Sequence, residues 1–175
     1  IIGGVVVVAL VVTILVTFGS DSGATETGDP AITGDALAIF TAPQGDPAIG
    51  SPIPVVEGSD FDGSPVAITD DGRAKIILFL AHWCPVCQAE VPVVRQYLAD
   101  GLLPAEIDLY SVATSISPTR DNYPPSEWLE GEAWNAPVLV DDAASSVANV
   151  FGLSAYPFWV FVDEDNTVIG RLTGR

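Results

Sequence analysis

The chain has 175 residues, of which 49% are hydrophobic, and this is enough to bury the core of one domain of medium size. Six basic residues against 23 acidic ones give a formal net charge of −17, which disfavours partnership with nucleic acid or with anionic lipid headgroups. Two cysteines and one histidine are too few for a zinc site with four nitrogen or sulfur ligands.

The N-terminal segment 1–18 is an unbroken apolar run in which Thr13 and Thr17 carry the only hydroxyl groups. At about 1.5 Å per residue it forms a helix of roughly 27 Å, close to the hydrocarbon thickness of a bilayer. A signal peptide usually has a shorter apolar region and a small-residue cleavage site, which the following GSDSG does not resemble. We therefore expect a transmembrane helix at 1–18, preceded by a basic flank because no methionine marks Ile1 as a start. The acidic remainder is expected on the extracytoplasmic side of the plasma membrane.

Residues 19–52 are rich in Gly, Pro, Thr, Ser and Asp and show no sustained period, which is typical of a linker. A flexible coil of about 34 residues spans roughly 30 Å on average. Its one apolar patch is ALAIF at 36–40, for which we expect a short helical turn that covers the core. The alternative for this patch is docking on the domain or on a partner.

The predicted domain at 53–175 alternates short apolar runs with amphipathic segments. AKIILFLA at 74–81 is typical of a strand buried on both faces of a sheet, and the helical period after the cysteines stops at Gly101. The other predicted elements are a hairpin at 54–68 turning near Asp62 and Gly63, strands at 107–114 and 137–142, a helix at 144–152, and a hairpin at 157–172 turning on Asp165 and Asn166. This order predicts an α/β fold, a mixed sheet with helices on its faces.

Both cysteines and the only histidine fall in AHWCPVCQAEVP at 81–92. The strand at 74–81 runs directly into this segment, and a helix is predicted to begin at or just after Cys84. Free backbone N–H groups and the helix dipole stabilise an anion at that position. The two-residue spacing to Cys87 allows a disulfide that one helical turn holds in either redox state, so we expect a redox-active dithiol.

Three other uses of these cysteines fit the sequence less well. His82 is too close to both sulfurs in sequence to share a zinc ion with them. A copper-delivery site needs three residues between the cysteines and a distant histidine. A static disulfide across two residues closes a small loop and stabilises a fold little. We expect no metal, and no cofactor beyond the Cys84–Cys87 couple.

FLAHWCPVCQAEVP resembles the active-site segment of the thioredoxin superfamily, and in particular of its membrane-anchored, exported TlpA/ResA-like thiol-disulfide oxidoreductases. The resemblance covers roughly residues 50–172 on motif order. Trp83 precedes the first cysteine as in the family, and Pro92 stands where the active-site helix carries a kinking proline. AYPF at 155–158 resembles the family's cis-proline loop, with Pro157 as the candidate.

The resemblance implies catalytic roles for Cys84, Cys87 and Glu90. Cys84 is the implied attacking thiolate, and the more buried Cys87 the implied resolving thiol. Glu90 stands where ResA-like proteins place an active-site acid, and it relays protons to or from Cys87 if it is buried. A solvated helix glutamate is the alternative for this residue.

Substrate binding is implied for Trp83, Tyr156 and Pro157. Trp83 packs beside the disulfide and shapes the docking surface, while Pro157 lies beside the sulfurs and the backbone of Tyr156 pairs with an extended client strand. His82 is expected to be a structural or solvent-facing residue.

The chain also departs from the family pattern. The strand before the motif offers Leu78 and its neighbours in place of the buried aspartate of thioredoxin, so a proton relay must use Glu90, His82 or water. Strong oxidants place a histidine between the cysteines, whereas Pro85 and Val86 offer no such donor, which favours a less oxidising potential. The family adds a closing helix after the last hairpin, and we expect it in the full gene product.

These features predict an extracytoplasmic thiol-disulfide oxidoreductase that acts on exported protein clients, with apocytochrome c as one candidate. Its expected electron source is a membrane donor or respiratory complex. The alternative is an accessory subunit of a membrane respiratory or assembly complex whose domain serves mainly for docking. One lysine against five arginines, with abundant Ala, Val, Gly and Asp, is typical of a high-GC genome and favours an actinobacterial origin.

Overall fold

The computed structural model describes residues 26–174. The predicted transmembrane helix at 1–18 lies outside this range. Between residues 26 and 174, no helix combines the length and the apolar character needed to cross a bilayer.

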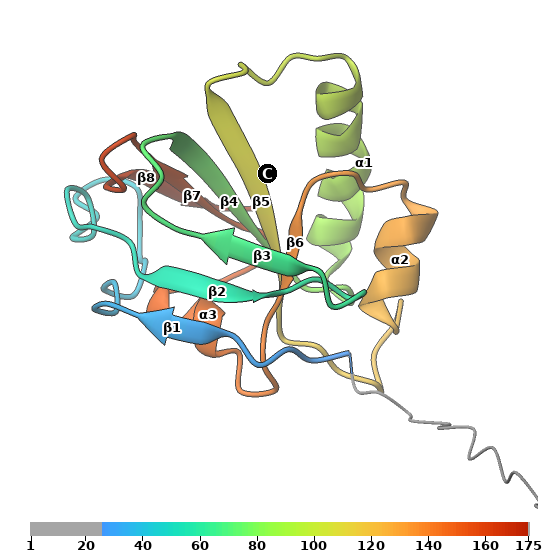
Figure 1. The fold of residues 1–175 in the computed structure, drawn as a ribbon. Coiled ribbons are helices and arrows are strands. Elements are labelled where there is room, and N and C mark those ends of the chain that lie inside the picture. Colours follow the sequence, from blue (N-terminus) through green and yellow to red (C-terminus); the bar gives the residue numbers. More distant parts are fainter. Residues whose placement is uncertain (1–25, 175) are drawn as a thin grey trace, which may run out of the picture.

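The centre of the fold is a five-stranded mixed sheet in the order β6-β5-β4-β7-β8 (Figure 1). Strand β4 (Ala74–Leu80) pairs in parallel with β5 (Ile107–Ala113), which pairs in parallel with β6 (Val138–Val140). On the other side of β4, β7 (Phe158–Val162) and β8 (Val168–Thr173) complete the sheet with antiparallel pairings. The mixed sheet with helices on its faces is confirmed.

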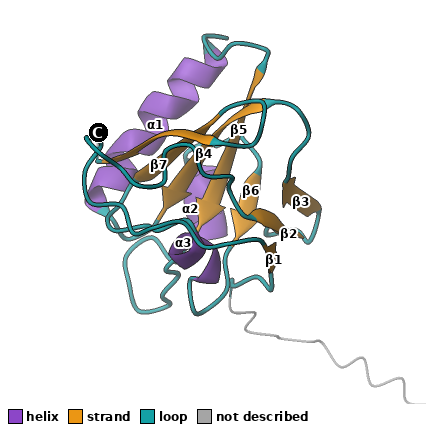
Figure 2. Ribbon diagram, turned by 90° about the vertical axis from the view of Figure 1, so that its left-hand side faces the viewer, coloured by secondary structure: helices purple, strands orange, loops and turns teal. Residues whose placement is uncertain are grey.

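The two faces of this sheet are covered differently (Figure 2). Helix α1 (Pro85–Ala99) and the short α2 (Pro125–Gly131) pack with one apolar cluster, and α3 (Ser146–Val150) packs with the other. Helix α1 begins with a proline, whose missing N–H costs nothing in the first turn. It ends before Gly101, which has a φ of +66° as predicted for the residue after a helix.

A second, three-stranded antiparallel sheet joins α3 on its face of the fold. Its strands are β1 (Ala31–Thr33), β2 (Val55–Ser59) and β3 (Pro65–Ile68), in that order. The predicted hairpin supplies β2 and β3, with Gly63 in the turn at a φ of +80°. The partner strand β1 comes from the segment that was expected to be a linker.

The structure thus differs from the predicted linker at 19–52, because its described part from residue 26 onward packs on the domain. Leu37 and Phe40 are buried in the core, and their backbone N–H groups donate to the carbonyls of Val150 and Gly152, both at 2.8 Å. The helical turn expected at 36–40 is absent, because this segment has no regular secondary structure and its N–H groups donate to carbonyls at and just after the end of α3. Leu37 and Phe40, which stand apart from other apolar runs in the sequence, thus pack in the same core cluster as α3.

A buried ion pair fastens this N-terminal segment to β8. The Arg171 guanidinium donates to both carboxylate oxygens of Asp46, at 2.8 Å from Nε and 2.5 Å from Nη2, and neither side chain is exposed. Its Nη1 atom donates to the carbonyls of Ala38 and Phe151, both at 2.9 Å. The Arg171 hydrogen bond lowers the pKa of Asp46. Gly152 leaves room for this arrangement, because an added Cβ would lie 2.3 Å from the Ala38 oxygen.

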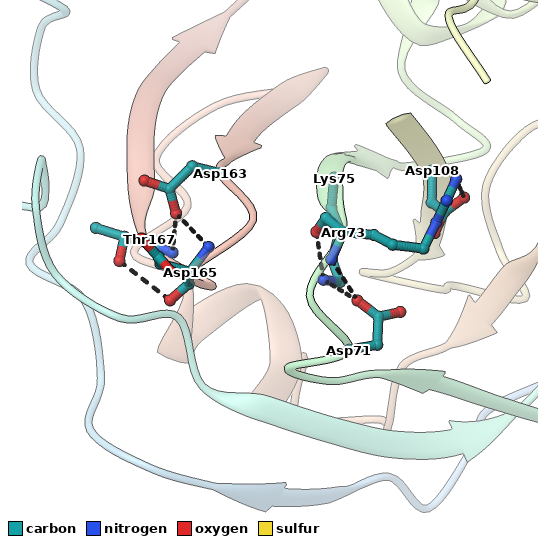
Figure 3. Close-up of polar contacts among 7 residues, drawn as sticks. All are labelled: Asp71, Arg73, Lys75, Asp108, Asp163, Asp165 and Thr167. Carbon is teal, nitrogen blue, oxygen red and sulfur yellow. Dashed lines mark hydrogen bonds and ion pairs between the residues drawn. The ribbon is translucent and has the colours of Figure 1, made fainter. Parts of the chain in front are cut away.

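The turn between β7 and β8 follows the prediction. The Oδ1 atom of Asp163 accepts hydrogen bonds from the N–H groups of Asp165 and Thr167, at 3.1 and 2.8 Å (Figure 3). Asn166 adopts a φ of +59°, which its short polar side chain tolerates.

Two cations at the start of β4 are held by carboxylates in the same view (Figure 3). Arg73 makes a two-point contact with Asp108, at 2.7 and 2.9 Å, and Lys75 binds Asp71 at 2.5 Å. With Arg171, three of the five basic residues within 26–174 are therefore engaged in ion pairs.

Candidate active site

Cys84 stands at the N-cap position of α1, directly after β4. Its extended backbone, with φ −79° and ψ 118°, lets its N–H donate to the Ala81 carbonyl at 2.9 Å, while its own carbonyl accepts from Gln88 at 3.0 Å. Cys87 lies one turn further along. The two cysteines approach to 3.6 Å as free thiols, so a small movement suffices to form a disulfide between them.

The two thiols differ in their surroundings. Cys84 retains 8% exposure, whereas Cys87 has none. Burial raises the pKa of Cys87, and the nearby Cys84 and Glu90 raise it further against an opposing backbone hydrogen bond at Ala81. Cys87 is therefore a neutral thiol at physiological pH, and Cys84 is the sulfur that an incoming group reaches first.

Glu90 lies half-buried on α1, beside a shallow cavity of about 290 Å³ that Trp159, Phe161 and Leu172 also line. Its charge contributes to the raised pKa of Cys87, so the two groups are electrostatically coupled. The structure thus places Glu90 within the influence of Cys87 but leaves it in contact with solvent. Glu90 is thus neither fully buried, as expected for a proton relay, nor fully solvated, as the alternative supposed.

The loop before β7 lies against the dithiol. The Tyr156–Pro157 peptide bond is cis, as the resemblance implies, and Pro157 is buried. The Cys84 thiol points toward the carbonyl oxygen of Tyr156 at 3.9 Å. The Tyr156 hydroxyl shares a hydrogen bond of 2.6 Å with Ser115, and burial raises the pKa of this tyrosine, which keeps it a neutral phenol.

Trp83 fills the space between this loop and the segment after β5. Its ring meets Tyr156 edge-on with centroids 5.8 Å apart, and its Nε1–H donates to the Ser115 carbonyl at 2.8 Å. The guanidinium carbon of Arg120 lies 4.5 Å from the ring centroid. The side chain is thus fixed beside Cys84. Its role in shaping a docking surface stays a prediction.

His82 has a structural role in this site. The ring is buried, and its Nε2 atom accepts a hydrogen bond of 3.1 Å from the Ser117 N–H. Nδ1 must then carry the proton that reaches the Asp121 carbonyl at 2.7 Å. Burial lowers the pKa of His82, and the charge of Arg120 lowers it further against this hydrogen bond. The neutral ring ties the segment after β5 to the turn between β4 and α1, which confirms the structural expectation.

This arrangement predicts a pH dependence of stability. Because the folded state disfavours protonated His82, the unfolded state binds more protons as the pH falls below about 6.5, and the free energy of unfolding decreases in that range. Urea denaturation at stepped pH values measures this slope in the wild type and in His82→Asn. We expect the stability of the variant to fall less than that of the wild type between pH 6.5 and 5, and identical pH profiles would contradict the role of the neutral ring.

Sequence reasoning missed a buried carboxylate at the same edge of the sheet. Asp141 follows β6 and accepts from the Thr114 hydroxyl at 2.7 Å and from the N–H groups of Val147 and Ala148 at 2.9 and 3.1 Å. Burial raises the pKa of Asp141 while these donors oppose the shift. Its position after a buried strand was the available signal, because the carboxyl ends of parallel strands meet at one edge. It caps α3 and steadies the edge that carries the dithiol.

Comparison with known proteins agrees with this geometry. The fold is that of the thioredoxin-like thiol-disulfide oxidoreductases, as shown by the thioredoxin domain of such an enzyme from Bacteroides vulgatus, with a TM-score of 0.56, 22% identity, and coverage of 73% of this chain and 90% of that one. A secreted disulfide oxidoreductase from Mycobacterium tuberculosis aligns with a TM-score of 0.55 and 21% identity, covering 68% and 83% of the two chains. Residues 48–174 match the Redoxin family model, and the chain belongs to that family.

A curated relative is the methylamine utilization protein MauD of Methylophilus methylotrophus, 22% identical over 128 residues. The alignment covers 71% of this chain and 56% of MauD, so the chain spans about half the length of that relative. Among residues 26–174, no group of three or more His, Cys, Asp or Glu side chains is arranged to hold a metal ion.

Proposed function

We propose that the protein is an extracytoplasmic, membrane-anchored thiol-disulfide oxidoreductase of the TlpA/ResA kind that reduces or exchanges disulfides in exported proteins. The observation that carries this proposal is the approach of Cys84 and Cys87 to 3.6 Å at the start of α1, beside the loop of Tyr156 and Pro157. A static structural pair does not need a sulfur at a helix start facing a loop carbonyl.

The geometry supports a two-step reduction. The Cys84 thiolate attacks a client disulfide, forms a mixed disulfide and releases one client thiolate. Cys87 then loses its proton and attacks the Cys84 sulfur, so that the second client thiolate leaves and the protein holds an intramolecular disulfide. Two electrons pass to the client, and a membrane donor must return them. Because the pKa of Cys87 is raised, this second step needs a proton acceptor, and Glu90 is the coupled carboxylate.

The location and the clients belong to the proposal. The apolar segment 1–18 and the secreted state of the M. tuberculosis neighbour support an extracytoplasmic site. The carbonyl of Tyr156 beside Cys84 supports recognition of an extended client strand. Apocytochrome c, whose cysteines must be reduced before haem attachment, remains one candidate client.

Reduction of insulin disulfides by the protein, with dithiothreitol as electron source, tests the activity. We expect the wild type to accelerate insulin precipitation and Cys84→Ser to reduce the rate to that of dithiothreitol alone, since the serine hydroxyl cannot replace the attacking thiolate. Wild-type protein that gives no acceleration would contradict the proposal. Co-purification with a membrane complex, unchanged by Cys84→Ser, would then favour an accessory docking role.

A further inference from the structure

An exposed cation lies beside the dithiol. The Arg120 side chain is exposed, and its guanidinium carbon is 4.5 Å from the ring centroid of Trp83, the residue directly before Cys84. The same ring meets Tyr156 edge-on, and the carbonyl of Tyr156 faces the Cys84 sulfur. The Trp83 indole therefore contacts both the Arg120 guanidinium and the Tyr156 ring, whose residue faces the reactive thiol.

The backbone on both sides of Arg120 is fixed to the turn between β4 and α1 that carries His82 and Trp83. The His82 ring accepts from the Ser117 N–H and donates to the Asp121 carbonyl, so its two bonds bracket Arg120. Trp83 adds a third tie through the Ser115 carbonyl at 2.8 Å. A cation held in this way loses little conformational entropy when it binds a partner.

The remaining positive charges of the described chain are placed elsewhere. Arg73, Lys75 and Arg171 are in ion pairs, and no ion pair is formed by Arg120 or Arg95 within residues 26–174. Arg95 is eleven residues beyond Cys84, roughly 16 Å along α1 at about 1.5 Å per residue. In a chain of net charge −17, an acidic client is repelled by most of the surface and attracted at Arg120.

We propose that Arg120 determines client specificity by favouring clients that carry an aspartate or glutamate next to the cysteine that Cys84 attacks. A guanidinium stacked on an indole keeps its N–H edge available for a two-point contact with a carboxylate. This inference rests on the proposed function and names the client class. Asp121, which follows Arg120 and is also exposed, opposes the effect and limits its size.

The test uses three peptide disulfides that differ only in the residue beside the reactive cysteine: Glu, Gln or Lys. Second-order rates of their reduction by the reduced protein are expected to fall in that order, with roughly threefold between Glu and Gln at low ionic strength and convergence at about 1 M salt. Arg120→Gln is expected to bring the Glu-to-Gln rate ratio close to one, and Arg120→Lys to retain part of it. Asp121→Asn is expected to increase the ratio.

Arg95→Gln is the matched control, because it removes the same charge at a distance from the dithiol, and it is expected to keep the wild-type ratio. Equal rates for the Glu and Gln peptides with the wild type, or an unchanged ratio in Arg120→Gln, would overturn the specificity role. Failure of the wild type to reduce any of the three peptides would overturn the proposed function and this inference with it, so the two failures are distinguishable.

Discussion

Cys87→Ser is expected to stop turnover and to leave Cys84 joined to the client through a mixed disulfide. The reason is the division of labour between the sulfurs: Cys84 is the one an incoming disulfide reaches, and Cys87, buried one turn inside α1, is the one that releases the product. We expect a loss of at least about a hundredfold in turnover, since only an external thiol resolves the adduct. Non-reducing electrophoresis and intact mass measure the adduct.

Two controls make this result specific to the proposed order of attack. Cys84→Ser is expected to form no adduct with the same client, because the remaining thiol is inaccessible and its pKa is raised by burial. The double variant is expected to behave like Cys84→Ser. An adduct that forms through Cys87 in the Cys84→Ser protein would show that the roles are reversed.

The second large effect is expected at the buried pair of Asp46 and Arg171. Asp46→Asn removes the charge that compensates the guanidinium, and leaving one buried charge unpaired costs about 3–5 kcal/mol. Since a domain of this size has a free energy of unfolding of about 5–15 kcal/mol, the loss is a large part of the total. Urea denaturation followed by tryptophan fluorescence measures it at pH 7.

Asp35→Asn is the matched control, because Asp35 is an exposed acid of the same N-terminal segment, and a change within about 0.5 kcal/mol is expected there. The pH adds a second check. Arg171 lowers the pKa of Asp46, so the pair's contribution is present above the unfolded pKa of 3.8 and is lost as the pH falls through the lower folded pKa. Equal stability of Asp46→Asn and Asp35→Asn would contradict the stabilising role of the buried Asp46–Arg171 ion pair.

The sequence predicts the elements whose signals are local. The apolar run at 74–81 becomes the central strand β4, because a strand covered on both faces needs apolar side chains throughout. Gly101 ends α1 and Asn166 forms the β7–β8 turn, since each position needs a residue that tolerates a positive φ. The positions of Cys84 and of Pro157 were also predictable, because a recognisable motif carries each of them.

Contacts between distant segments could not be predicted from these local signals. Strand β1 and the buried Leu37 and Phe40 come from a stretch of polar and small residues, and their partners are distant in sequence. β1 pairs with β2, and the backbone of Leu37 and Phe40 binds carbonyls at the end of α3. Arg171 lies 125 residues beyond its partner Asp46. Helix α2 was missed because it has seven residues and no complete amphipathic period. The hydrogen bonds of His82 were equally hidden, since both of its ring partners lie in a segment without a motif.

Redox titration of the Cys84/Cys87 couple in glutathione buffers of stepped potential tests the central claim most directly. The account predicts one two-electron transition in which both thiols disappear together, the protein loses the mass of two hydrogen atoms, and no glutathione stays attached. Because the dipeptide between the cysteines offers no histidine to the thiolate, we expect a midpoint of about −250 mV or lower. A protein that becomes glutathionylated at Cys84 without forming the intramolecular disulfide would contradict the account.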